Sequence, residues 1–271
     1  MTRPVFGALP AAGTESTPTL DELFDCPSAR NLRRVPGRTT FAWPERGAPC
    51  WVVKRFAGER FSGGEWRERW YARLRGRLPC PPGRREFDNL RGLAADGLPV
   101  PQALAWAGRP PERPGWLGGA RSLVVMRWVP HSETLRERIA SAGAAERRRL
   151  CERLLEVVLR LHAAGWYHRD LYLQHFVLRE AEGPELALLD VGRARKERAP
   201  RRRWLEKDLA ALSHSAPACV PARERLRFLA AYLDARGVTG RRARRRWARA
   251  IEARRARVAA HVPRHGEGAR G

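Results

Sequence analysis

The sequence predicts an α+β fold of two lobes, a small lobe rich in β-strands followed by a larger helical lobe. Three observations favour this arrangement. Across residues 31–126, short apolar runs alternate with turn residues around a single helical pattern. From about residue 128 onward, the apolar residues recur at helical spacing. Between these regions, residues 122–130 form an apolar strand pattern that ends at Pro130, as expected of a connection between lobes.

These patterns divide the chain into three parts. Residues 1–27 are rich in Pro, Ala, Thr and Gly, and we expect them to form a flexible N-terminal arm. Residues 28–262 are predicted to form the folded domain, with a first lobe over about 28–127 and a second over about 128–262. Residues 263–271 are left as a tail.

The composition is that of a soluble protein. The chain has 271 residues, of which 43% are apolar, enough for a substantial core. It shows no signal-peptide pattern, and no apolar run approaches the roughly 18 residues that a membrane span needs. The five cysteines form no C-x-x-C pair. We therefore expect a reducing cytoplasm, with neither metal-binding nor redox cysteines.

A loop with two aspartates carries the strongest functional signal. Asp170 ends a His-Arg-Asp triplet that lies between a predicted helix and the apolar run 176–178, and Asp190 follows a second apolar run. Kinase-type sites are built this way: the first carboxylate accepts the proton of the attacking hydroxyl, and the second holds the Mg²⁺ that bridges the nucleotide phosphates. A bare triplet would be weak in a chain so rich in arginine, so the ordered context decides. It indicates a protein-kinase-like fold.

A lysine and a glutamate upstream support the same function. The run 51–56 reads as a strand that carries Lys54, which could reach nucleotide phosphates and pair with a glutamate of the next helix. Of the 53 basic residues only three are lysine, and a compact ammonium is the group that a planar guanidinium cannot replace. Glu86, Leu90 and Leu93 share one helical stripe, so Glu86 should point inward. The alternatives are a surface position for Lys54 and a solvated helix start for Glu86.

Other positions have supporting roles. A helix over about 144–162, closed by Gly165, should lie under the catalytic loop. Asp208, in a helical pattern over 204–212, is a candidate brace for that loop, with a solvated position as the alternative. We expect a nucleotide base to stack near Met126 and to hydrogen-bond to the backbone of Arg127 to Val129. A plain edge strand is the alternative there.

Three separated segments together resemble the lipopolysaccharide core heptose kinases, relatives of the eukaryotic-type protein kinases. They are His168-Arg169-Asp170 with Tyr172, His175 and Phe176, the strand before Asp190, and Arg203-Trp204 with Lys207-Asp208-Leu209. The resemblance covers roughly residues 31–233 and implies ATP-dependent, Mg²⁺-assisted phosphorylation of a heptose hydroxyl, on the lipopolysaccharide core glycolipid at the inner face of the cytoplasmic membrane. It also implies that Asp170 is the catalytic base, Asp190 a Mg²⁺ ligand, and Lys54 with Glu86 the phosphate-orienting pair.

The sequence departs from protein kinases at several points. His175 stands where they carry asparagine, so it is the candidate second metal ligand, although imidazole suits Mg²⁺ less well than an amide oxygen. Whether a second metal binds is open. The only candidate phosphate loop, residues 36–41, lacks G-x-G-x-x-G, and no A-P-E segment follows Asp190. A small or lipid-linked acceptor is therefore favoured over a protein.

The net charge of +24 predicts a polyanionic partner. Two basic clusters stand out, residues 60–85 with Trp66, Trp70 and Tyr71, and residues 241–257 with Trp247. Arginines interleaved with aromatic rings suit the headgroup region of an anionic membrane, so we expect peripheral attachment to the inner face of the cytoplasmic membrane. Taken alone, the clusters would suit RNA equally well. We nevertheless do not favour a nucleic-acid partner.

Two other functions stay open. One is a small-molecule kinase of the aminoglycoside type on the same fold. The other, from a different class, is a pseudokinase or nucleic-acid-binding module that keeps the fold without turnover. The presence of Lys54, Glu86, Asp170 and Asp190 together argues against a pseudokinase.

Overall fold

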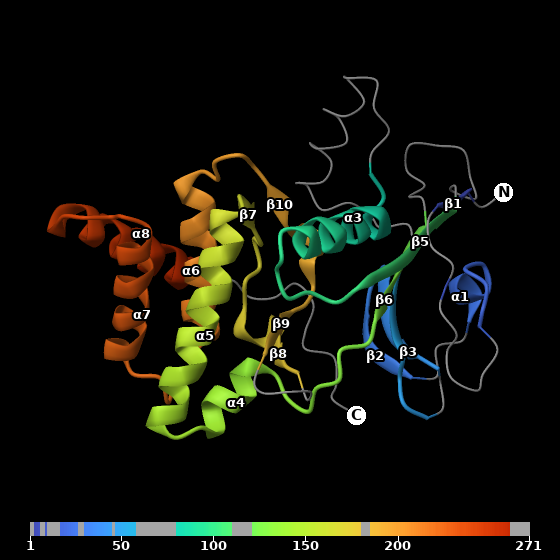
Figure 1. The fold of residues 1–271 in the computed structure, drawn as a ribbon, viewed down its shortest axis with the longest axis horizontal. Helices are drawn as coiled ribbons and strands as arrows, with labels where there is room; N and C mark the ends of the chain where they lie inside the picture. The colour runs from blue at the N-terminus through green and yellow to red at the C-terminus, as the bar shows by residue number, and fades with distance from the viewer. Residues whose placement is uncertain are drawn as a thin grey trace. The chain divides into compact units, whose positions relative to one another are not determined.

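The computed structural model describes residues 3–5, 9, 17–26, 30–44, 47–57, 80–109, 121–179 and 185–260. The chain divides into two compact units. The first comprises Met1–Arg91 and Pro101–Trp128, and the second comprises Gly92–Val100 and Val129–Gly271. The first is built on an antiparallel sheet and the second is mainly helical (Figure 1). The predicted α+β class is confirmed.

The first unit contains a six-stranded sheet in the order β1-β5-β6-β4-β3-β2. Its strands are β1 (Arg3–Val5), β2 (Asn31–Val35), β3 (Arg38–Trp43), β4 (Trp51–Phe56), β5 (Ala103–Arg109) and β6 (Arg121–Arg127). β4 has the bounds that the sequence predicts, and it pairs with β3 on one side and β6 on the other. Lys54 lies opposite Thr40 and Val124 in these neighbours. The lysine is therefore carried by an interior strand, whose backbone is held on both edges.

The short helix α1 (Glu22–Asp25) corrects the prediction of a flexible arm over residues 1–27. Leu23 and Phe24 are fully or almost fully buried in a core with β3, β4, β5 and β6. Arg109 lies over the Phe24 ring and bonds to the Asp25 carboxylate at 2.8 Å. The physical reason is burial: without this helix, one apolar face of the sheet would be exposed to water. β1 also belongs to the sheet rather than to an arm.

The helix α3 (Pro82–Ala95) begins directly on β6. Gly83 donates its backbone N–H to Ser122 Oγ at 3.1 Å, and a Cβ on Gly83 would come within 2.6 Å of the Leu123 carbonyl oxygen. Only glycine allows this close approach. Adjacent residues of a strand point to opposite faces. Val53 packs with α1 and Lys54 bonds to Glu86 of α3, so the two helices cover opposite faces of the sheet (Figure 1).

Five helices form the body of the second unit. They are α4 (Leu135–Ser141), α5 (Ala144–Ala163), α6 (Arg202–Ser215), α7 (Ala222–Ala235) and α8 (Arg241–Ala259). α5 buries Leu150, Leu154, Val158 and Leu161 as predicted, with Leu155 only half-buried. The chain leaves α5 at Gly165, whose φ of 86° and close approach to the Glu197 carbonyl oxygen exclude a side chain. This sharp exit leads straight into the His-Arg-Asp loop.

Two small hairpin-like pairs hold that loop within the second unit. β7 (Trp166–Tyr167) pairs with β10 (Arg195–Lys196), and β8 (Phe176–Leu178) pairs with β9 (Leu186–Leu188). The 3₁₀ turns η1 (Leu173–His175) and η2 (Val191–Arg193) precede β8 and follow Asp190. Leu189 donates its N–H to the His175 carbonyl at 2.7 Å. The pairing brings the segment of Asp170 and the segment of Asp190 together, and the predicted turn at residues 182–184 lies outside the described residues.

Candidate active site

In the first unit, the ammonium of Lys54 is paired with the carboxylate of Glu86. Lys54 Nζ lies 2.5 Å from Glu86 Oε1, and the two residues are only 8% and 1% exposed. A buried charge is tolerated when an opposite charge and hydrogen bonds satisfy it. The predicted pairing is confirmed. Neither a surface lysine nor a solvated glutamate describes these positions, whereas Asp88, off the predicted stripe, is exposed.

In the second unit, Asp208 of α6 holds the loop that carries Asp170. Its carboxylate accepts hydrogen bonds from the backbone N–H of His168 at 2.6 Å and of Arg169 at 2.7 Å. The buried ring of His162 lies 3.4 Å from the same carboxylate. Hydrogen bonds to an ionised group are roughly twice as strong as neutral ones. Asp208 is thus the predicted brace, and its burial rules out the solvated alternative.

Two residues of this region adopt a left-handed backbone. Among the described residues other than glycine, only Arg169 (φ 76°) and Asp190 (φ 55°) have a positive φ. Such a conformation costs on the order of 1–3 kcal/mol and persists only where the surroundings fix it. The bond from the Arg169 N–H to Asp208 is one such contact. Backbone strain therefore gathers immediately before Asp170 and at Asp190 itself, as it does at functional sites.

The carboxylate of Asp170 lies between two cations. Its Oδ2 is 2.7 Å from Arg193 Nη1, and its Oδ1 is 3.7 Å from Lys207 Nζ. The Asp170 side chain is 20% exposed, so a reactant can reach it. The sequence analysis assigned neither cation a role at the site, because each lies on another element far along the chain. The signal for Lys207 was present in the rarity of lysine.

His175 and Asp190 form the candidate metal site. His175 Nδ1 lies 2.9 Å from the Asp170 carbonyl oxygen, and Nε2 lies 3.8 Å from Asp190 Oδ2. When Nδ1–H donates to that carbonyl, a neutral ring turns the lone pair of Nε2 toward Asp190. Mg²⁺ is commonly held by one or two carboxylates together with substrate phosphates and water. Asp190 fits this pattern, and no three His, Cys, Asp or Glu residues of the described chain gather into a metal cluster of their own.

The predicted base-binding residues are partly committed to other bonds. In the first unit, Met126 is buried, and the backbone N–H of Arg127 donates to the Gln102 carbonyl at 2.8 Å. In the second unit, the Val129 carbonyl lies 2.6 Å from His131 Nδ1. The Arg127 amide is therefore not available as a donor to a base. Of the predicted set, the Val129 amide is left as the donor and Met126 as the apolar contact.

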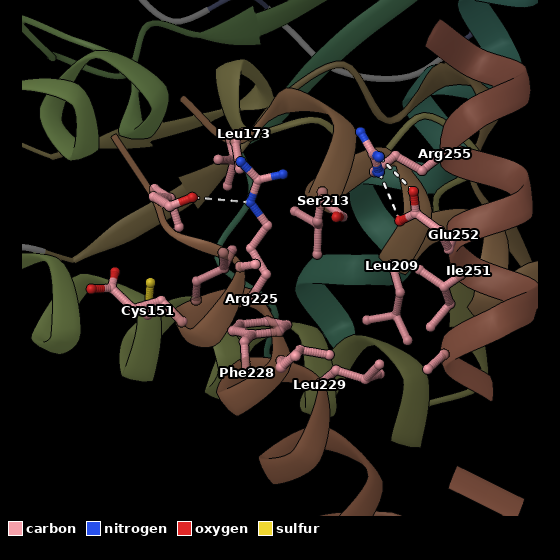
Figure 2. Close-up of a pocket in the computed structure, with 18 of the residues that line it drawn as sticks. Cys151, Leu173, Leu209, Ser213, Arg225, Phe228, Leu229, Ile251, Glu252 and Arg255 are labelled. Carbon is pink, nitrogen blue, oxygen red and sulfur yellow. Dashed lines mark hydrogen bonds and ion pairs between the residues drawn. The ribbon is translucent and has the colours of Figure 1, made fainter. Parts of the chain in front are cut away.

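The second unit also contains a pocket of about 570 Å³. Figure 2 shows Cys151, Leu173, Leu209, Phe228, Leu229 and Ile251 around it, with Arg225 and the Arg255–Glu252 pair on its edges. Arg225 donates to the Val220 carbonyl at 3.2 Å. Leu226, which also lines the pocket, is 60% exposed. The lining is therefore mainly apolar, with charged groups among it, and none of these residues was singled out by the sequence analysis.

Fold and site together define the class of the protein. A β-rich unit carries a buried strand lysine paired with a helix glutamate, and a helical unit carries a braced His-Arg-Asp loop followed by a strained aspartate. This combination is that of the kinase-like phosphotransferases.

Comparison with known proteins agrees with this class. Two relatives are lipopolysaccharide core heptose(I) kinases named WaaP. The chain is 31% identical to that of Pseudomonas aeruginosa over 168 residues, which are 59% of this chain and 62% of the relative. It is 36% identical to that of Escherichia coli over 75 residues, which are 26% of this chain and 28% of the relative. A solved structure of WaaP in complex with acyl carrier protein shares the fold, with a TM-score of 0.61 at 24% identity over 84% of this chain and 88% of that one.

Residues 51–232 match the lipopolysaccharide kinase (Kdo/WaaP) family, and the chain belongs to that family. The match includes Lys54, Glu86, Asp170 and Asp190. The chain spans about three fifths of the length of the Pseudomonas relative and about a quarter of that of the Escherichia relative.

Lys54→Met is expected to destabilise the first unit, because it leaves the Glu86 carboxylate buried without its cation. Breaking a buried pair by removing one partner costs about 3–5 kcal/mol. Lys54→Met combined with Glu86→Gln removes both charges and should recover much of that loss. Urea unfolding of the three proteins measures the difference. Arg84→Met, which breaks the exposed pair with Asp88, serves as the control and should change the free energy of unfolding by less than about 1 kcal/mol. A Lys54→Met protein as stable as the wild type would contradict the buried pair.

Proposed function

We propose that this protein is an ATP-dependent kinase that phosphorylates a heptose hydroxyl of the lipopolysaccharide inner core. The family supports phosphoryl transfer in lipopolysaccharide assembly, and the names of the two bacterial relatives support the heptose acceptor. The observation that carries the proposal is Asp170. It is a partly exposed carboxylate on a braced and strained loop, and His175 links it to Asp190.

Each polar residue of the site has a role in this proposal. Asp170 is the base that orients the acceptor hydroxyl and receives its proton. Lys54, held by Glu86, pairs with the nucleotide phosphates. Asp190 is the Mg²⁺ ligand and His175 the candidate second ligand. The buried apolar side chain of Met126 and the amide of Val129 receive the base.

The reaction forms one bond and breaks another. The acceptor hydroxyl oxygen bonds to the γ-phosphorus of ATP, the bond from that phosphorus to the bridging oxygen breaks, and ADP leaves with the electron pair. Asp170 takes up the hydroxyl proton, and the brace by Asp208 keeps its carboxylate aligned with the attacking oxygen. When bound, Mg²⁺ neutralises charge on the phosphates. The lack of an A-P-E segment favours a glycolipid acceptor over a peptide.

Asp170→Ala is expected to lower kcat by about 10²–10⁴-fold, the usual contribution of a general base, with little change in ATP affinity. Asp190→Asn is expected to abolish turnover while the protein stays folded, because the amide cannot replace the metal-binding charge. Transfer of radiolabelled phosphate from ATP to purified core glycolipid measures both, and Asp88→Asn on the exposed face of α3 is the control. Wild-type-like turnover by Asp190→Asn would refute the assignment. Transfer to an aminoglycoside but to no core glycolipid would favour the small-molecule kinase.

We also infer that the protein attaches to an anionic membrane surface where its glycolipid acceptor resides. On α8, the arginines at 241, 242, 245, 246 and 249 are exposed. Each basic residue near an anionic surface contributes about 1 kcal/mol, so several together suffice for reversible attachment. Within the described parts of the chain, no helix is long and apolar enough to cross a bilayer. This leaves the charged surface as the means of attachment in the proposal.

The aromatic part of the membrane prediction needs correction. Trp247 is only 8% exposed, and its ring lies near the buried Tyr232, with Arg202 over it at 4.8 Å. It packs inward because the apolar stripe of α8 faces the second unit, so it cannot insert into a headgroup layer. Trp66, Trp70 and Tyr71 lie outside the described residues. Among the described residues of this unit, Leu226 is the large apolar side chain that is well exposed.

Neutralising two α8 charges with Arg241→Gln and Arg245→Gln should weaken binding to phosphatidylglycerol vesicles roughly 30-fold, at about 1 kcal/mol for each arginine. Arg148→Gln with Arg149→Gln on α5, which removes the same charge from another exposed site, is the matched control and should change binding less. Sedimentation at low and high salt gives both affinities, and binding should weaken with salt. Equal binding to phosphatidylcholine vesicles, or a preference for RNA at matched charge, would overturn the membrane proposal.

An acyl carrier protein is a further proposed partner, because a WaaP structure was solved in complex with one. Two features of this chain favour it: the strong positive charge, and the mainly apolar pocket of the second unit, which suits an acyl chain. Titration calorimetry with acylated and unacylated carrier should show tighter binding of the acylated form. Equal affinity for the two forms would exclude the pocket, and no binding of either would exclude the partner.

A further inference from the structure

Lys207 places a shielded ammonium beside the candidate base. Its Nζ lies 3.7 Å from Asp170 Oδ1, and its side chain is 32% exposed. The next residue, Asp208, bonds to the backbone of the catalytic loop on the same side of the molecule. The position of Lys207 relative to Asp170 is therefore fixed by the same brace that shapes the loop. At 3.7 Å the ammonium is near the carboxylate without being held in a short bond, so it can still bind another anion.

Composition makes this lysine unusual. The chain has 53 basic residues, of which only Lys54, Lys196 and Lys207 are lysine. Lys54 is buried in its pair with Glu86, and Lys196 bonds to Asp96 at 2.6 Å with half its side chain exposed. Lysine presents a compact point charge, whereas arginine presents a planar fork. Two of the three lysines thus lie at the candidate active residues, where a compact cation suits a phosphate oxygen.

We propose that Lys207 is a further catalytic residue, whose ammonium contacts the γ-phosphoryl group of ATP while that group passes to the acceptor. The inference rests on the proposed kinase function and deepens it. As the bond to the bridging oxygen breaks and the acceptor oxygen bonds to phosphorus, negative charge spreads over the equatorial phosphoryl oxygens. Lys207 neutralises this charge, while Asp170 receives the hydroxyl proton. A preorganised cation at developing charge stabilises the transition state more than the ground state.

The surroundings of Asp170 favour Lys207 for this role over its neighbours. Tyr172, two residues after the base, packs its ring against His175 and brings no cation. Arg193 bonds to Asp170 Oδ2 at 2.7 Å, but its side chain is 54% exposed and more strongly solvated. Burial lowers the pKa of Lys207, and the Asp170 carboxylate opposes that shift while the guanidinium groups of Arg193 and Arg169 add to it. A desolvated ammonium among other cations gains from an additional anion such as a phosphate.

The test compares Lys207→Met and Lys207→Arg with the wild type in two measurements. Lys207→Met should lower kcat on the order of 100-fold, the scale found for one lost group at an oxyanion. It should also reduce the affinity for the non-hydrolysable ATP analogue AMP-PNP relative to ADP by about tenfold, because only the analogue has a γ-phosphate. Lys207→Arg keeps the charge without its shape, so it should fall between the two proteins. Lys196→Met is the matched control and should keep the wild-type ratio of affinities.

Two results would overturn the proposal. One is a Lys207→Met protein with wild-type kcat and an unchanged ratio of AMP-PNP to ADP affinity. The other is an equal loss of affinity for both nucleotides with a lowered melting temperature, which would show a structural role. If Lys207→Met fails to fold, the affinity ratio of Lys207→Arg decides. The nucleotide comparison needs no acceptor, so it decides the role of Lys207 even if the wild type phosphorylates no core glycolipid, a result that would count against the proposed acceptor alone.

Discussion

The candidate site depends on the buried carboxylate of Asp208. Its two oxygens accept the backbone N–H groups of His168 and Arg169, and the ring of His162 approaches them from α5. If the loop moved away, an ionised group would be left buried with its hydrogen bonds unmade, which is among the costliest defects in a protein interior. The same contact keeps Arg169 in its left-handed conformation. Asp170, the next residue, is thereby presented in one orientation.

Helix α6 does more than supply this brace. It also carries Lys207 beside Asp170, and Trp204, whose ring stacks on Tyr167 at 5.2 Å and nearly parallel. Tyr167 lies in β7, directly before the His-Arg-Asp triplet, and its hydroxyl donates to Glu197. Burial together with that carboxylate raises the pKa of Tyr167 to about 12, so the phenol stays protonated and remains a donor. One helix therefore sets the position of the loop by packing, by hydrogen bonding and by charge.

The large positive charge has little to do with folding. Pairs such as Arg84–Asp88 and Arg179–Glu185 lie on the surface, where an ion pair contributes from nothing to about 1 kcal/mol. The pairs that matter to the site are the few that are shielded, above all Lys54–Glu86. In this chain, exposed arginine serves attraction to polyanions, and lysine is concentrated near the candidate reacting groups. The distinction follows from the hydration and shape of the two cations.

Local patterns were sufficient for much of the architecture. The bounds of β4, the inward face of α3 and the apolar stripe of α5 were all predicted, because strand and helix periodicity are properties of a short stretch of chain. The same periodicity was not sufficient for α1 and Trp247. Four helical residues give no recognisable period, so Leu23 and Phe24 were assigned to an arm although they complete a core. Trp247 was predicted from its arginine neighbours, but the face that it occupies is decided by what α8 packs against.

The sequence by itself determined the identity of the candidate chemistry. It gave the His-Arg-Asp triplet, the following aspartate and the lysine–glutamate pair, since each stands in a short and ordered context. Only the tertiary structure decided which charges surround those groups. Arg193 and Lys207 meet the two oxygens of Asp170 from η2 and α6, and no local pattern relates residues so far apart in the chain. Electrostatic environment depends on distance and burial in three dimensions, and folding alone brings these groups together.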